Sequence, residues 1–287
     1  MNPTETIERS AWAKVNLALS VGPANDSGMH PICSWMACVD LCDRIRISRL
    51  SDGDPSVFDL GWEDGSPVGW DAADDLIVRA HTLMERECGR ALPVRIELLK
   101  TIPDGGGLGG GSSNAGAVML ALDERFGLGL GLERLRKLSA HLGSDVAFFI
   151  DDQSPPRAAI VSGLGDRIER VGPVSGEVTL VCPPFGCPTG AVYLAYDEAP
   201  GELRERDVRD MALLTPDPER MFNDLAPPAE RVEPRLADLR SFLQGVLGHS
   251  VHVSGSGSTL LVIGPEGASE RARLAAPSCR VIPTRFV

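Results

Sequence analysis

Glycine is concentrated where the chain could bind phosphate. Six glycines fall in the seven positions 105–111, and two serines and an asparagine follow at 112–114. Glycine adopts positive φ angles and permits close approach to the backbone, so consecutive N–H groups can point toward an anion. A helix that begins directly after such a run adds the positive end of its dipole. The pattern predicts a phosphate-binding loop.

Two well-known phosphate loops do not match this run. Gly105, Gly107 and Gly110 have dinucleotide-binding spacing, but Asp123, the acid at the expected distance, ends a predicted helix rather than a strand. The run also lacks the lysine that follows the last glycine of a P-loop. An NAD-dependent oxidoreductase is therefore a weak alternative. A flexible linker is disfavoured because a strand and a helix bound the run.

The flanking segments predict the elements that position the loop. Residues 94–99 are rich in β-formers, and residues 115–122 have helix-forming composition. Ser112, Ser113 and Asn114 are all acceptable N-cap residues for that helix. The expected order is strand, glycine loop, helix.

Polar residues alternate with apolar ones near the N-terminus. Residues 13–20 predict a strand with Val15, Leu17 and Leu19 on a core face and Lys14 and Asn16 together on the other. A second strand is expected at 44–48, a polar loop at 51–74 and a helix from Leu76 to about Cys88.

Asp145 follows a predicted helix end. Leu132, Leu135, Leu138 and Leu142 recur at helical spacing, and Gly143 suits a left-handed cap, so the helix is expected to stop at His141 or Leu142. Taken locally, an N-cap role for Asp145 and a solvated position for Lys14 are the simplest alternatives to catalytic roles.

The second half of the chain predicts short strands, at 158–161, 178–182, 251–253 and 259–263. The proline-rich stretch 215–234 is expected to be an irregular connection. Composition changes near 155–165, which is the candidate domain boundary.

Composition limits the possible partners. The 287 residues carry 28 Lys and Arg against 40 Asp and Glu, a formal net charge of −12, which disfavours nucleic acid and anionic membranes. The first ten residues are polar, and no stretch approaches the roughly 20 apolar residues of a membrane span. Seven cysteines without a CxxC pair favour free thiols over disulfides or zinc. A cytoplasmic protein with a small-molecule substrate is expected.

The segment from Pro103 to Ala115 closely resembles the ATP loop of the GHMP kinase superfamily. Further blocks resemble that family in the same order along the chain. The resemblance is most detailed to the members whose acceptor is 4-diphosphocytidyl-2-C-methyl-D-erythritol. The further blocks lie at 13–17, 27–30, 74–77, 142–146, 222–225 and 253–258.

The resemblance implies an α+β fold of two domains. Residues 1–164 would form an N-terminal ATP-binding domain like domain 2 of ribosomal protein S5, and residues 165–287 a ferredoxin-like C-terminal domain, with the substrates meeting in the cleft between them. The implied activity is ATP-dependent phosphorylation of the acceptor's 2-hydroxyl in non-mevalonate isoprenoid synthesis. ATP would bring Mg²⁺, and the protein would be a monomer or homodimer.

The resemblance also assigns roles to residues. Lys14 and Asp145 would be catalytic, with Asp145 as the base that also contacts the substrate. Ser112 and Ser113 are both open as Mg²⁺ ligands. The residues implied to bind ATP are Lys100, Pro103, Gly105, Gly106, Gly107, Leu108, Gly109, Gly110, Gly111, Ser112, Ser113 and Asn114. Those implied to bind the acceptor, besides Asp145, are Asn16, His30, Thr189, Tyr193, Gly255 and Ser256.

Three positions depart from the family pattern. Met29 and Met36 replace aromatic residues, and Asp75 replaces an asparagine. Methionine can pack on a base but supplies no stacked π pair. A GHMP kinase with another alcohol acceptor is thus one alternative. A catalytically silent nucleotide-binding protein is another, disfavoured because Lys14 and Asp145 are both present.

Overall fold

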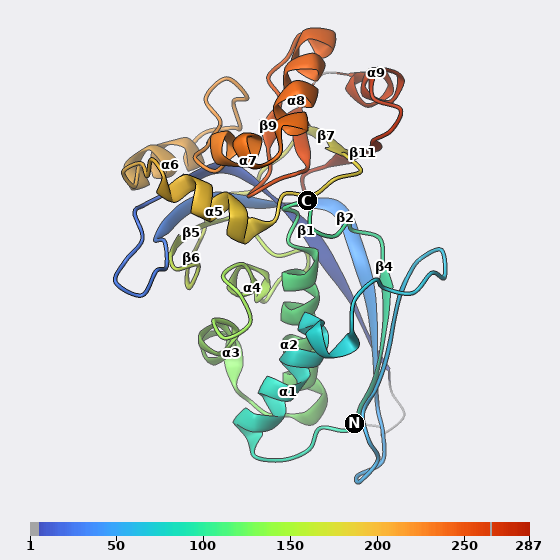
Figure 1. The fold of residues 1–287 in the computed structure, drawn as a ribbon. Helices are drawn as coiled ribbons and strands as arrows, with labels where there is room; N and C mark the ends of the chain where they lie inside the picture. Colours follow the sequence, from blue (N-terminus) through green and yellow to red (C-terminus); the bar gives the residue numbers. More distant parts are fainter. Residues whose placement is uncertain (1–5, 265) are drawn as a thin grey trace. The chain divides into compact units, whose positions relative to one another are not determined.

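The computed structural model describes residues 6–264 and 266–287 (Figure 1). The chain divides into two compact units that interleave along the sequence. Unit 1 comprises residues 1–13, 41–102 and 109–156, and unit 2 comprises residues 14–40, 103–108 and 157–287. The predicted division is instead a single cut after residue 164, and it stays a prediction.

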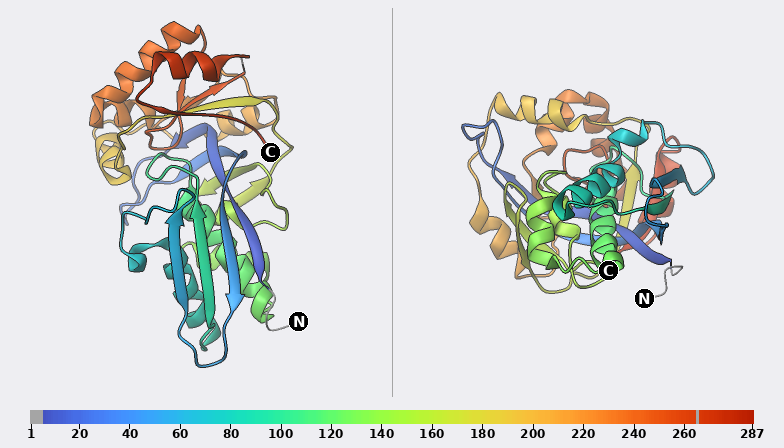
Figure 2. Two further views of the ribbon diagram at one scale, coloured as in Figure 1. Left: turned by 90° about the vertical axis from the view of Figure 1, so that its right-hand side faces the viewer. Right: turned by 90° about the horizontal axis from the view of Figure 1, so that it is seen from below.

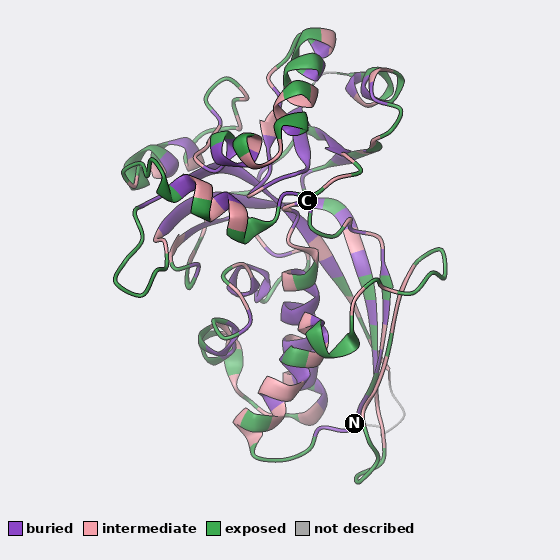
Figure 3. Cartoon of the chain, viewed as in Figure 1, coloured by how far each residue is buried: buried purple, intermediate pink, exposed green. Residues whose placement is uncertain are grey.

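Unit 1 is a sheet packed on helices. The end of β2 (Ile32–Arg49) pairs antiparallel with β4 (Val94–Lys100), which pairs parallel with β3 (Val57–Trp62). Helices α1 (Leu76–Cys88), α2 (Gly110–Phe126), α3 (Gly131–Ser139) and α4 (Val146–Phe149) complete the unit. Figure 2 shows the strands lying over α1 and α2, and Figure 3 shows α2 buried along much of its length.

The core of unit 1 follows the alternation of its strands. Ile45 and Ile47 of β2 and Ile96 and Leu98 of β4 point inward and are at most 1% exposed. They pack with apolar residues of α1 and α2, among them Met84, which is fully buried. This packing fixes both elements that flank the glycine run.

Helix α1 matches its prediction. The Asp75 carboxylate accepts a hydrogen bond from the Ile77 amide, and Gly89 ends the helix with a φ of 62°. An acidic N-cap and a left-handed glycine C-cap are the usual signals for these two ends.

Helix α2 begins earlier than predicted. Its N-cap is Gly109, with a φ of 70°, so Ser112, Ser113 and Asn114 lie inside the helix instead of capping it. The glycine run therefore provides the helix's first residues as well as the loop. The amides of Gly110, Gly111 and Ser112 are in the first turn, where N–H groups have no partner within the helix.

Two other predicted boundaries in unit 1 are wrong. Helix α3 ends at Ser139, because the chain turns there and the amides of Leu142 and Gly143 both donate to the Ser139 carbonyl. Gly143 does not have the positive φ of a left-handed cap. The predicted polar loop at 51–74 contains β3, a short half-buried strand that lies between two stretches rich in aspartate and glycine.

Unit 2 contains an antiparallel sheet of four strands, in the order β11, β7, β10, β9. Between β7 and β9 the chain forms several helices, and α9 (Ala268–Ala275) joins β10 to β11. This βαββαβ pattern confirms the ferredoxin-like prediction for the C-terminal region. The strands are β7 (Glu177–Cys182), β9 (His252–Val253), β10 (Leu260–Ile263) and β11 (Arg280–Arg285).

Strand β1 (Ile7–Val21) lies between β2 and β8 (Phe222–Asn223), and its residues from Lys14 onward belong to unit 2. The start of β2 pairs with β5 (Ala159–Gly163), and β5 pairs with β6 (Arg167–Arg170). The helices are α5 (Thr189–Asp197), α6 (Glu205–Ala212), α7 (Ala226–Val232) and α8 (Pro234–Leu247).

The stretch 215–234 is more regular than predicted. It holds β8 and α7, and α8 starts at its last residue. Its prolines explain the error, because α7 and α8 each carry proline in the first turn, where the missing N–H costs no hydrogen bond.

The thiols behave as the sequence predicts. All seven cysteines lie in the described residues and are free, four of them buried. Within the described residues, no helix combines the length and the apolar character needed to cross a bilayer.

Candidate active site

Lys14 and Asn16 form an ordered polar pair on β1. Both side chains are 3% exposed, and the Lys14 ammonium donates to Asn16 Oδ1 at 2.7 Å. Asn16 Nδ2 in turn donates to Ser34 Oγ at 2.8 Å, and Ser34 donates to the Ala18 carbonyl. The predicted shared face is confirmed, whereas a solvated Lys14 is excluded. A lysine this buried requires partners, and these hydrogen bonds fix its position.

The segment Ser254–Gly255 lies directly over this pair. A Cβ on Gly255 would be 3.4 Å from both Lys14 Nζ and Asn16 Oδ1. Asn223 holds the segment, because its amide donates to the carbonyls of Val253 at 2.8 Å and Gly255 at 2.7 Å. Gly255 thus lets the backbone approach the charged group.

The first half of the glycine run packs against the same segment. Gly107 has a φ of 76°, and a Cβ there would overlap the Ser254 carbonyl oxygen. The Ser254 hydroxyl donates to the Gly107 carbonyl at 3.2 Å, and the Lys14 amide donates to the Leu108 carbonyl at 2.9 Å. Unit 2 therefore brings Gly107, Leu108, Lys14, Asn16 and Gly255 together.

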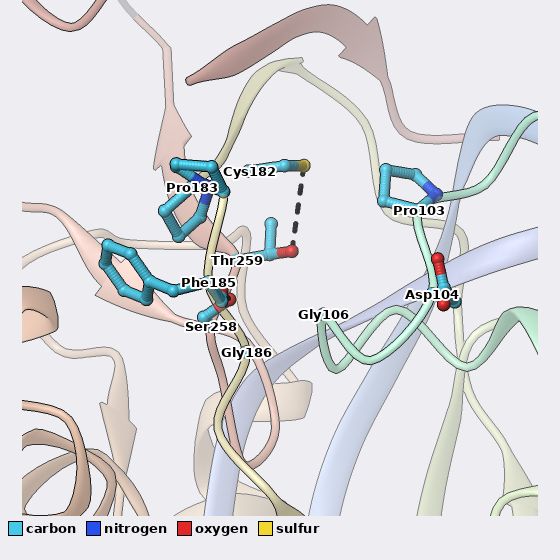
Figure 4. Close-up of a pocket in the computed structure, with 10 residues that line it drawn as sticks. Pro103, Asp104, Gly106, Cys182, Pro183, Phe185, Gly186, Ser258 and Thr259 are labelled. Carbon is cyan, nitrogen blue, oxygen red and sulfur yellow. Dashed lines mark hydrogen bonds between the residues drawn. The ribbon is translucent and has the colours of Figure 1, made fainter. Parts of the chain in front are cut away.

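A pocket of about 220 Å³ opens beside Gly106. Figure 4 shows Pro103 and Asp104 across it from Cys182 and Pro183. Thr259 Oγ1 donates to Cys182 Sγ at 3.7 Å, and burial raises the pKa of this thiol. The thiol therefore stays protonated, and it lines the pocket without being activated as a nucleophile.

Four predicted acceptor residues lie in an aromatic cluster or next to the Ser254–Gly255 segment. The His30 ring lies 5.0 Å from the Tyr193 ring and 5.7 Å from the Tyr196 ring, centroid to centroid. Its Nδ1 is 3.0 Å from the Gly22 carbonyl and its Nε2 is 3.4 Å from Asp197 Oδ1. Thr189 Oγ1 lies 2.9 Å from Ser256 Oγ.

Met29 lies beside His30 in sequence but is 50% exposed. Sequence reasoning missed Tyr196, whose hydroxyl donates to the Val21 carbonyl and whose pKa burial raises. This phenol fixes α5 against the end of β1. A tyrosine three residues after Tyr193, on the same helix face, is the signal that could have found it.

In unit 1, Lys100 is buried and paired. Its ammonium is 3.0 Å from Asp43 Oδ2, and it lies 5.3 Å from the Trp62 ring centroid and 6.0 Å from that of Trp70. Trp70 Nε1 donates to Asp75 Oδ2 at 2.8 Å. Asp75, which lacks the amide of the family's asparagine, thus caps α1 and receives an indole N–H instead.

Asp145 occupies the position that precedes α4. It is half-buried, and no described amide of the first turn of α4 donates to its carboxylate. Asp145 is thus the N-cap residue of α4 by position but not through its side chain, and its catalytic role stays a prediction. Asp145 belongs to unit 1, whereas Lys14 and Asn16 belong to unit 2.

Sequence reasoning also missed Asp43, Trp62 and Trp70 as residues of these clusters, and it placed Asn223 in a family block without giving it a role. For Asp43 a signal exists, since an acid stands at an inward position of the alternating series Leu41, Asp43, Ile45, Ile47. The tryptophans stood in a stretch predicted to be a loop, and the partners of Asn223 are about 30 residues away.

Comparison with known proteins gives consistent results. Residues 75–153 match the GHMP kinases N terminal domain. The 4-diphosphocytidyl-2-C-methyl-D-erythritol kinase of Variovorax paradoxus (strain S110) is 32% identical over 279 residues, which is 93% of this chain and 90% of that protein. The protein of the same name from Caulobacter vibrioides (strain NA1000 / CB15N) is 34% identical over 291 residues, 93% of this chain and 94% of that one.

A solved structure agrees. The crystal structure of a 4-(cytidine 5'-diphospho)-2C-methyl-D-erythritol kinase superposes with a TM-score of 0.75 at 28% identity, and the match covers 98% of this chain and 99% of that one. The predicted α+β fold of the GHMP kinases is thereby confirmed. This chain belongs to the 4-diphosphocytidyl-2-C-methyl-D-erythritol kinase family of GHMP kinases.

Proposed function

We propose that the protein transfers the γ-phosphoryl group of ATP to the 2-hydroxyl of 4-diphosphocytidyl-2-C-methyl-D-erythritol. The relatives' printed names support this acceptor, because each match covers at least 90% of both chains. The observation that carries the chemistry is the buried Lys14–Asn16 pair beneath Gly255 and next to Gly107. It places a fixed cation beside backbone suited to phosphate.

In this proposal Asp145 accepts the proton of the acceptor hydroxyl. The hydroxyl oxygen forms a bond to the γ-phosphorus, the bond from that phosphorus to the bridging oxygen breaks, and ADP leaves with the electron pair. Lys14 stabilises negative charge on the transferring group. Phosphoryl transfer depends on positioning and charge stabilisation more than on covalent chemistry, so a base and a held ammonium suffice.

The glycine run would bind the phosphates of ATP through its amides. The positive φ angles of Gly105, Gly107 and Gly109 expose successive N–H groups, and the first turn of α2 adds further unpaired ones. This arrangement suits an acidic protein, because backbone donors replace a basic patch.

Mg²⁺ would enter with ATP and be held by phosphate oxygens, water and one serine hydroxyl. The described residues contain no group of three acidic, histidine or cysteine side chains that could form a cage for it. Serine oxygen is a suitable ligand for this hard cation, which usually keeps several waters. Ser112 is half-buried and Ser113 is buried, and both are in the first turn of α2.

The acceptor would bind through Asn16, Gly255, Ser256 and Thr189, with His30 and Tyr193 at its cytosine. The 5.0 Å spacing of the two rings suits contact with a planar base. The exposed Met29, in place of an aromatic, favours the second candidate function, a kinase of this fold with a different alcohol acceptor.

Replacing Asp145 tests the proposed chemistry. We expect Asp145→Asn to cut kcat by at least about 100-fold, the usual scale for a lost general base, while the Kd for ATP changes little. The measurement is ADP release at saturating ATP and acceptor, with ATP binding followed by calorimetry. Asp52→Asn is the matched control, because Asp52 is exposed and its ion pair with Arg49 lies at the surface.

Near-normal turnover of Asp145→Asn would remove Asp145 from the reaction. ATP binding without acceptor-dependent ADP release in the unmodified protein would instead indicate the silent nucleotide-binding alternative.

A further inference from the structure

Asp43 is a fully buried carboxylate that the proposed chemistry does not use. It lies on β2 and is 0% exposed. The neighbouring inward-facing positions of the strand hold apolar residues, Leu41, Ile45 and Ile47. Burying a charge at such a position is costly unless partners surround it. An apolar residue at this position would avoid that cost, so packing of the sheet does not explain the carboxylate.

Four donors converge on this carboxylate. Oδ1 accepts from the backbone amides of Thr101 at 2.6 Å and Ile102 at 2.7 Å. Oδ2 accepts from Lys100 Nζ at 3.0 Å and from Asn114 Nδ2 at 3.0 Å. Both oxygens are therefore used, and every contact requires an acceptor.

These donors stand at the two ends of the glycine run. Thr101 and Ile102 are the last residues before Pro103, and Asn114 lies in α2 after the last glycine. One side chain thus links the segment entering the run to the helix leaving it. A glycine-rich segment has many accessible conformations, so fixing its ends reduces the entropy lost when a ligand orders it.

Asp43 also determines where Lys100 points. The ammonium is held between this carboxylate and the rings of Trp62 and Trp70. A Cβ on Gly110 would lie 3.7 Å from the same ammonium, so Lys100 packs against the first residue of α2.

We propose that Asp43 is a positioning residue for ATP, which holds both ends of the glycine run and the Lys100 ammonium in their binding geometry without touching the nucleotide. This inference rests on the proposed function, because it requires the run to bind ATP. It assigns Lys100 and Asn114 an indirect part in that binding, through Asp43.

The substitution Asp43→Asn tests the inference. An amide of the same shape has one acceptor oxygen, so one pair of donors loses its partner. We expect the Kd for a non-hydrolysable ATP analogue to rise about 10-fold or more, the scale of losing a charge-assisted hydrogen bond. The Kd for the diphosphocytidyl acceptor should stay within about twofold, because its proposed contacts do not include Asp43 or its partners.

Asp40→Asn is the matched control. Asp40 lies on the same strand but is partly exposed, and its carboxylate is 3.4 Å from the Arg285 guanidinium. Both Kd values should stay at the unmodified level in this variant.

A second variant decides the matter if Asp43→Asn does not fold. Asn114→Ala removes one donor to Asp43 and leaves the Asp43–Lys100 ion pair intact. The substitution breaks no other side-chain hydrogen bond of this amide oxygen, because Asn114 Oδ1 has no partner among the described residues. The analogue's Kd should rise about threefold or more, with the acceptor's Kd unchanged.

The outcomes separate the two proposals. An unmodified protein that does not bind the ATP analogue contradicts the proposed function itself. If the unmodified protein binds it and the folded variants bind it equally well, the positioning role of Asp43 is wrong. Equal weakening of analogue and acceptor would show a general structural role and would also overturn the inference.

Discussion

Gly107 shows why single residue types matter in this site. Its positive φ and its contact with Ser254 both require a residue without a Cβ. The left-handed region costs an L-residue about 1–2 kcal/mol, and the overlap with the Ser254 carbonyl adds to that cost. The Gly107 backbone can therefore lie against the Ser254 segment only because of this glycine.

We predict that Gly107→Ala separates these two segments and weakens ATP binding about 10-fold or more, with a lower midpoint of thermal unfolding. Calorimetric titration with an ATP analogue measures the change. Gly172→Ala is the control, since Gly172 lacks a positive φ and nothing lies within 4 Å of its Cβ position. Unchanged binding by Gly107→Ala would show that the glycine run is not the phosphate site.

At the same scale, sequence reasoning found some residues and missed others for a physical reason. Lys14 and Asn16 stand two apart on a strand, so alternation alone places them on one face, as the structure confirms. The bonds from Asp43 to Lys100 and Asn114 join residues 57 and 71 positions apart. Local pattern contains no information about such partners.

At the scale of elements, whether a segment is a helix or a strand was more predictable than the residues at which it begins and ends. The strand at 94–100 and helix α1 have clear periodicity and caps, and both were predicted to within a residue or two. Helix α2 starts five residues before its predicted beginning, because glycines that look like loop residues form its first turn. Strand β3 was missed because it is short and lies between stretches rich in aspartate and glycine, which are typical of loops.

His252 on β9 offers an element-scale prediction. Burial lowers the pKa of its imidazole, and this effect exceeds the increase caused by the hydrogen bond to the Pro218 backbone. Arg240 lowers the pKa and Glu219 raises it, both to a smaller extent. Its Nε2 has no hydrogen-bond partner among the described residues. The unfolded chain therefore binds a proton more readily than the folded one, and stability falls as the pH drops below about 6.5.

We expect His252→Asn, which can keep a donor toward Pro218, to reduce this loss of stability. The thermal midpoint of the unmodified protein should fall more steeply between pH 7 and pH 5 than that of the variant. A difference of 1 kcal/mol corresponds to about 2 °C at this chain length. His249→Asn, at an exposed position, should follow the unmodified protein, and identical slopes for all three proteins would contradict the prediction.

At the scale of the whole molecule, the acidic net charge is compatible with the kinase family if, as proposed, backbone amides bind the phosphates. A net charge of −12 opposes binding to polyanions, whereas the proposed nucleotide site needs only amides of the glycine run and the buried Lys14. The fold class and the ferredoxin-like region were predictable, because ordered motifs along the chain identify a family. The interleaving of the two compact units was not, since it depends on long-range contacts.

The central claim is that this kinase recognises a diphosphocytidyl alcohol. Its most direct test compares kcat/KM for acceptor-dependent ADP release with 4-diphosphocytidyl-2-C-methyl-D-erythritol and with the same molecule lacking cytosine. The His30 and Tyr193 cluster predicts a decrease of about 10-fold or more on removing the base, the scale of one or two lost contacts to it. Equal kcat/KM values for the two molecules would contradict the claim and indicate a GHMP kinase with a different acceptor.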